Sequence, residues 1–64
     1  MRSVALSELI PTAQQLAGGT TETFVVADAT PEQLYAAVKA MTQFLGLKAS
    51  VTEAATGRVT VTRY

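Results

Sequence analysis

The stretch that decides the fold is TPEQLYAAVKAMTQFLG, residues 30–46. Thr30 is a residue type favoured at helix N-caps, Pro31 suits the first helical position, and Gln33 completes a capping box of the form T-x-x-Q. Apolar residues then recur at helical spacing and Gly46 is a typical helix stop; they are Leu34, Ala37, Val38, Met41, Phe44 and Leu45. The pattern predicts an amphipathic helix with Met41 and Phe44 in the core.

The residues that follow predict a β-hairpin. Residues 47–54 and 58–64 both alternate, and Gly57 can take the left-handed conformation that closes a three-residue loop over 55–57. We expect Thr52 opposite Thr60 and Val51 opposite Val61. One face then collects Leu47, Ala49, Val51, Val59 and Val61, and the other collects Lys48, Ser50, Thr52, Arg58, Thr60, Thr62 and Tyr64. Because both strands choose the same apolar side, the pattern supports this pairing.

Two further elements are expected before residue 30. Residues 20–28, TTETFVVAD, alternate and predict a strand with Phe24 and Val26 on one face. Residues 3–17 carry an apolar stripe and predict a helix that the Gly18–Gly19 pair ends. If this helix begins at Ser7, Pro11 lies near the first turn and is tolerated; if it begins at Ser3, we expect a kink at Pro11.

The predicted element order is α-β-α-β-β, which makes the chain one small α+β domain over residues 1–64. Residues 1–19 form the N-terminal helix and a Gly-Gly joint, and residues 20–64 form a β-α-β-β unit. We expect a three-stranded sheet in the order 1-3-2, with the helix of residues 30–46 packed on one face; the order 1-2-3 is the alternative. The preferred arrangement resembles half of a ferredoxin-like fold. This is a resemblance of architecture over residues 20–64, and it implies no function.

Composition excludes several kinds of chemistry. The chain has no cysteine and no histidine, which removes disulfides, thiol and imidazole catalysis and the usual ligands of transition metals. Its five carboxylates are not paired in sequence; they are Glu8, Glu22, Asp28, Glu32 and Glu53. We therefore expect no enzyme activity and no cofactor. No apolar run approaches the roughly 20 residues of a membrane span, and no secretory signal is present, so we expect a cytoplasmic protein.

A chain of 64 residues has little room for a core, and small domains often gain stability by self-association. We therefore expect a binding module that acts through protein–protein contact and forms a homo-oligomer. The helix of residues 3–17 either folds back over its own sheet, on the face of Val25 and the threonines, or pairs with a second copy. The expected partner contacts are Leu6, Leu9, Ile10 and Val25, together with the polar hairpin face.

The alternative function is that of a small nucleic-acid-binding regulator of the phage or plasmid type. Its contacts would be Lys48, Arg58, Arg63 and Tyr64 on the hairpin. Five basic and five acidic residues cancel, however, whereas affinity for nucleic acid depends largely on neutralising phosphates. The zero net charge therefore favours a protein partner.

Overall fold

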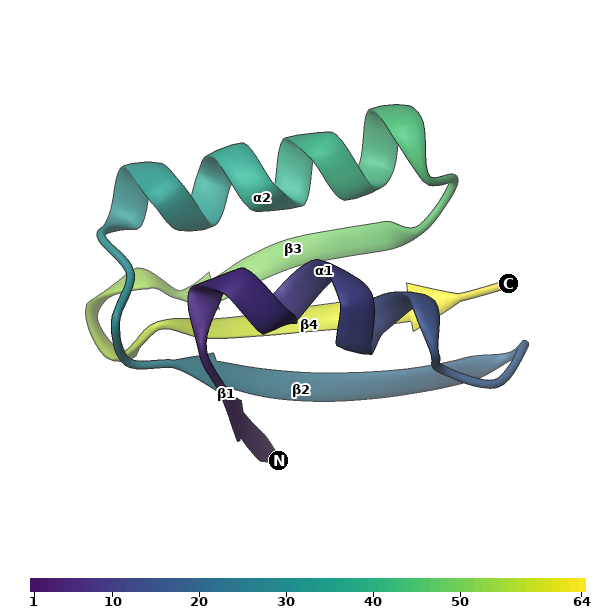
Figure 1. Cartoon of the computed structure of the whole chain (residues 1–64), viewed down its shortest axis with the longest axis horizontal. Coiled ribbons are helices and arrows are strands. Elements are labelled where there is room, and N and C mark those ends of the chain that lie inside the picture. The colour runs from purple at the N-terminus through teal and green to yellow at the C-terminus, as the bar shows by residue number, and fades with distance from the viewer.

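The computed structural model describes all residues, 1–64, as a four-stranded sheet with two helices (Figure 1). In chain order the elements are β1 (Arg2–Val4), α1 (Leu6–Gln14), β2 (Thr20–Val26), α2 (Pro31–Phe44), β3 (Lys48–Glu53), a 3₁₀ turn (Ala54–Thr56) and β4 (Arg58–Arg63). The α+β class is confirmed. The element order differs from the expected one by an additional strand before the first helix.

The strands lie in the order β1-β2-β4-β3. β4 is antiparallel to both of its neighbours, β2 and β3, while β1 is parallel to β2. The expected three-stranded sheet was wrong in its strand count, because β1 adds a fourth strand beside β2, whereas the three expected strands keep the preferred relative order 1-3-2. Within the larger sheet, the three expected strands follow one another as β2-β4-β3.

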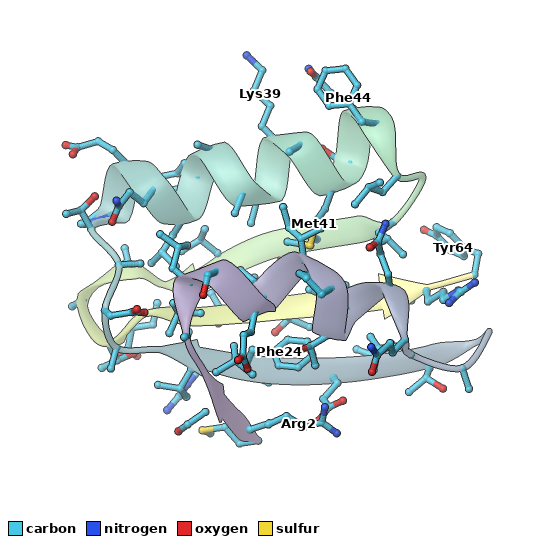
Figure 2. All side chains as sticks on the ribbon, viewed as in Figure 1. Arg2, Phe24, Lys39, Met41, Phe44 and Tyr64 are labelled. Atoms are coloured by element: carbon cyan, nitrogen blue, oxygen red, sulfur yellow. The ribbon has the colours of Figure 1, made fainter.

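The unexpected strand β1 is too short to show a periodic pattern in the sequence, since it has three residues. It pairs with the second half of β2, where Arg2 lies opposite Phe24. The Nε atom of Arg2 lies 3.2 Å from Oε1 of Glu22, and its guanidinium carbon lies 5.9 Å from the centre of the Phe24 ring (Figure 2). An ion pair and a cation–π contact thus add to the backbone pairing that holds β1 in place.

Both helices lie on the same face of the sheet (Figure 1). The core between helices and sheet consists of ten buried apolar side chains: Leu9, Ala13, Leu16, Phe24, Val26, Leu34, Met41, Leu47, Val59 and Val61. α1 therefore folds back over its own sheet, which was one of the two expected arrangements. It covers the apolar face and not the face of Val25 and the threonines, so that part of the expectation was wrong.

The start of α2 confirms the capping box read from the sequence. The hydroxyl of Thr30 accepts a hydrogen bond of 3.2 Å from the backbone N–H of Gln33, and Oε1 of Gln33 accepts one of 2.8 Å from the backbone N–H of Thr30. Pro31 occupies the first turn. At the other end, Gly46 has a φ of 67° and turns the chain back toward the sheet. The local sequence therefore sets both ends of this helix.

The limits of α1 differ from the expected ones. The helix begins at Leu6, so neither Ser3 nor Ser7 is its N-cap, and Ala5 at the N-cap position has no side-chain acceptor. A carboxylate from a distant part of the chain takes that role, because Oδ1 of Asp28 accepts a hydrogen bond from the backbone N–H of Leu6. Pro11 lies inside the helix, which ends at Gln14, before the Gly18–Gly19 pair. Local sequence alone therefore did not set this helix.

The hairpin forms with its pairing displaced by two residues from the expected one. Val51 lies opposite Val59 rather than Val61, and Ser50 lies opposite Thr60. The connection is longer than expected because residues 54–56 form a 3₁₀ turn and an irregularity follows Val51. Gly57 is left-handed, with a φ of 76°, as the sequence predicts. Since a shift of two preserves the alternation of side chains, the two faces keep the predicted composition.

Candidate functional site

The face of the sheet opposite the helices has no layer covering it, and we call it the open face. Side chains along a strand point alternately to the two faces of the sheet. Since Phe24 on β2 and Val59 on β4 point into the core, their neighbours in the strand point to the open face. The open face consists of Ser3, Thr21, Thr23, Val25, Lys48, Ser50, Thr52, Glu53, Arg58, Thr60 and Thr62. It draws on all four strands of the sheet.

Threonine side chains at the centre of the open face hydrogen-bond to each other across the strands. The hydroxyls of Thr21 and Thr62 lie 2.8 Å apart, and those of Thr23 and Thr60 lie 3.2 Å apart. Each pair joins residues that are direct partners in the β2–β4 ladder. These cross-strand hydrogen bonds link four side chains of the open face in two pairs.

The charged residues of the open face, Lys48, Glu53 and Arg58, have no ion-pair partner, since the one ion pair of the chain joins Arg2 to Glu22. Arg58 is half-buried opposite Val25, and its Nε atom is buried without a hydrogen-bond partner. Glu53 lies opposite Arg58 at the end of β3 and is the nearest carboxylate in the ladder. The open face is therefore weakly positive in a chain whose net charge is zero.

The expected partner contacts are divided between the core and the open face. Leu9 is completely buried, and Leu6 and Ile10 are half-buried where they pack against the core. Of the four residues, Val25 alone lies on the open face, and it is half-buried there. As placed, Leu9 has no surface to offer a partner, because α1 uses its apolar stripe to complete the core of its own chain.

The residues expected to contact nucleic acid do not form one group. Lys48 and Arg58 share the open face, and Tyr64 follows β4 with 77% of its surface exposed. Arg63 belongs to the other face, where its Nη1 atom donates hydrogen bonds to the backbone carbonyls of Gln14 and Leu16. Its guanidinium thus binds the C-terminal end of α1 and contributes to the structure of the domain.

Sequence reasoning missed an exposed aromatic residue on α2. Phe44 was expected in the core, but it is 80% exposed and points away from the sheet, as Lys39 does (Figure 2). Leu47 fills the core at this end, because Gly46 turns the chain and the backbone N–H of Leu47 donates to the carbonyl of Met41. The one sequence feature that indicates exposure of Phe44 is its position in the last turn of the helix. Met41 is completely buried, as predicted.

The surface shows no pocket, and no group of three acidic side chains is placed to hold a metal ion. Neither helix has the length and apolar character needed to cross a bilayer. The open face, to which all four strands contribute and which neither helix covers, is the candidate functional site. No family model, curated protein or solved structure matches this chain at a significant level.

Proposed function

We propose that this chain is a small, non-enzymatic binding module that acts in the cytoplasm through protein–protein contact, and that its binding surface is the open face. The proposal includes self-association. The observation that carries it is the pairing of threonine hydroxyls across β2 and β4 on a face that no helix covers. Architecture by itself does not indicate a function, so the argument depends on the chemistry of this face.

The threonine pairs lower the cost of covering the open face. A hydroxyl that is buried without a hydrogen bond is unfavourable, but Thr21, Thr23, Thr60 and Thr62 keep their mutual hydrogen bonds when a partner excludes water. The hydroxyl of Thr52 likewise donates to the backbone carbonyl of Arg58. Beside these satisfied hydroxyls, the open face offers a partner the methyl groups of its threonines and half-buried Val25.

Lys48 and Arg58 favour a partner that is negatively charged where it meets the open face. Both cations are free of ion pairs, and the open face places them on different strands. A protein with a flat surface and carboxylates at matching positions would complement them. Two cations are few for binding a nucleic acid, and the one aromatic side chain beside the open face, Tyr64, lies beyond the end of β4. The positive charge still makes nucleic acid the competing outcome.

Affinity capture with matched charge reversals tests the proposal. The wild-type chain, Arg58→Glu on the open face and Lys39→Glu on α2 are immobilised and exposed to lysate of the native host, with and without nuclease. Both variants change the charge by the same amount, and urea unfolding first establishes that both are folded. Each captured protein is then purified and its affinity for the three chains is measured by calorimetry.

The proposal predicts a protein that binds the wild type and Lys39→Glu equally, binds Arg58→Glu at least about tenfold more weakly, and is captured with or without nuclease. Capture that nuclease abolishes, together with steeply salt-dependent retention of mixed DNA or RNA, would replace the proposal with the nucleic-acid alternative. Equal binding to all three chains would remove the open face from the function.

A further inference from the structure

One long edge of the sheet is unpaired. β3 is hydrogen-bonded to β4 on one side and has no neighbour on the other. We call the free side of Lys48–Glu53 the β3 edge. The opposite edge is less regular, because β1 has three residues and covers only Phe24–Val26 of β2. A free strand edge presents backbone N–H and C=O groups that another strand can pair with.

The charges of the β3 edge are complementary to a second copy of itself. Lys48 stands at its start and Glu53 at its end, both exposed and neither in an ion pair. In an antiparallel pairing of two copies about a two-fold axis at Ser50, Lys48 faces Thr52 of the other copy. The irregularity after Val51 places Glu53 opposite Arg58, on the open face, so Glu53 of the other copy lies next to Thr52 on the same face as Lys48. The same geometry repeats at the other end, so one axis creates two attractive pairs.

The same register also matches the two faces of the sheet. Lys48, Ser50 and Thr52 belong to the open face, whereas Ala49 and Val51 lie on the helix side, half-buried against the core. Pairing centred on Ser50 places Ala49 opposite Val51 of the other copy, so the partly exposed apolar side chains cover each other. α2 packs on β3, so the two α2 helices are brought to the same side of a continuous sheet.

We propose that two copies of this chain pair through their β3 edges to form one eight-stranded sheet with Ser50 at the two-fold axis. The inference names the interface for the self-association included in the proposed function. The strand irregularity after Val51 shortens the regular part of the edge, and irregularities of this kind oppose extended pairing. A two-fold pairing uses the β3 edge of both copies, so it closes as a dimer.

A single engineered cysteine tests the position of the axis, because the chain has no cysteine of its own. Ser50→Cys places two thiols directly opposite each other in the proposed dimer, within reach of a disulfide. Thr21→Cys is the matched control, since Thr21 is also exposed on the open face but lies on β2, next to the uncovered half of the other edge. Both purified chains are oxidised under the same mild conditions, and the covalent dimer is followed over time.

Charge reversal tests the register independently of the cysteines. Sedimentation of purified wild type, Lys48→Glu, Glu53→Lys and the double variant gives each dissociation constant. Each single change replaces two attractive contacts by two repulsive ones, so we expect dimerisation about tenfold weaker. The double change restores opposite charges and returns the affinity toward the wild-type value.

The proposal requires Ser50→Cys to crosslink faster than Thr21→Cys and the double variant to recover dimerisation. A wild-type mass that stays monomeric up to millimolar concentration would overturn it, as would faster crosslinking of Thr21→Cys, which would assign the contact to the other edge. These measurements need no other protein. Their failure would therefore leave binding of a partner at the open face, tested through Arg58, as a separate question.

Discussion

Oδ1 of Asp28 accepts a hydrogen bond of 2.9 Å from the backbone N–H of Leu6, a residue 22 positions earlier in the chain. Leu6 is the first residue of α1, and Ala5 before it provides no side-chain cap. Asp28 belongs to the connection between β2 and α2. One carboxylate therefore satisfies a free N–H group of one helix from the segment that leads into the other helix, and it places negative charge at the positive end of α1.

This relationship predicts that Asp28→Ala destabilises the start of α1. Loss of a helix cap costs about 1 kcal/mol, so the free energy of unfolding in urea should fall by about that amount. Hydrogen exchange of the Leu6 amide should accelerate more than that of residues in α2. Asp28→Asn keeps an acceptor oxygen and should lose less than the alanine variant. An unchanged exchange rate for Leu6 in Asp28→Ala would show that the cap does not hold the helix.

Arg63 holds the other end of α1, and its removal should also destabilise the domain. Its Nη1 atom donates to the carbonyls of Gln14 and Leu16, with 3.0 Å to the latter. Removing these charge-assisted hydrogen bonds should lower the free energy of unfolding by about 1–2 kcal/mol in Arg63→Ala. Lys39→Ala is the matched control, because Lys39 is an exposed cation without an ion pair, and its loss should change the free energy by less than about 0.5 kcal/mol. Equal effects of the two variants would contradict the assignment of Arg63 to α1.

Gly57 and Gly46 allow the cost of a close backbone contact to be separated from the cost of a positive φ angle. Both have positive φ angles, 76° and 67°. A Cβ atom on Gly57 would collide with the carbonyl oxygen of Val26 and lie 2.9 Å from its carbonyl carbon, whereas a Cβ on Gly46 meets nothing within 4 Å. We therefore expect Gly46→Ala to cost about 1–2 kcal/mol from backbone conformation alone.

Gly57→Ala should cost about 4 kcal/mol or more, because the chain must also move away from Val26. For a domain of this size such a loss approaches the whole free energy of unfolding, so the far-ultraviolet circular dichroism should report a largely unfolded chain at 25 °C. If the two alanine variants unfold at the same urea concentration, the close approach between Gly57 and Val26 is not what makes position 57 special.

Local signals account for the parts of the fold that the sequence predicted. The ends of α2 follow from Thr30, Gln33 and Gly46, all of which act on neighbouring backbone. The composition of each face of the hairpin follows from strict alternation, which survived a displacement of two residues in the pairing. Most residues of the open face could therefore be predicted from the sequence. The packing of α1 on the other side of the sheet, which leaves this face uncovered, could not.

The parts that were not predicted depend on contacts between distant residues. The start of α1 is set by Asp28, and the position of β1 is aided by the contacts of Arg2 with Glu22 and Phe24. Neither relationship leaves a periodic trace in the sequence. α1 could have packed on either face of the sheet. It packs on the apolar face because its apolar stripe of Leu9, Ala13 and Leu16 is buried in the core there. Long-range packing, and not local propensity, set these features.

The two residues at the end of α2 that were expected to be equivalent, Met41 and Phe44, should differ sharply on substitution. Met41 is completely buried, so Met41→Ala leaves a cavity and should lower the free energy of unfolding by about 2–5 kcal/mol. Phe44 is 80% exposed, so Phe44→Ala should change it by less than about 0.5 kcal/mol despite removing the larger side chain. Urea unfolding of both variants, followed by circular dichroism, measures the difference. A large loss for Phe44→Ala at low protein concentration would mean that its ring packs against the domain after all. A loss that appears only at high concentration would instead show that Phe44 is buried between copies, away from the β3 edge.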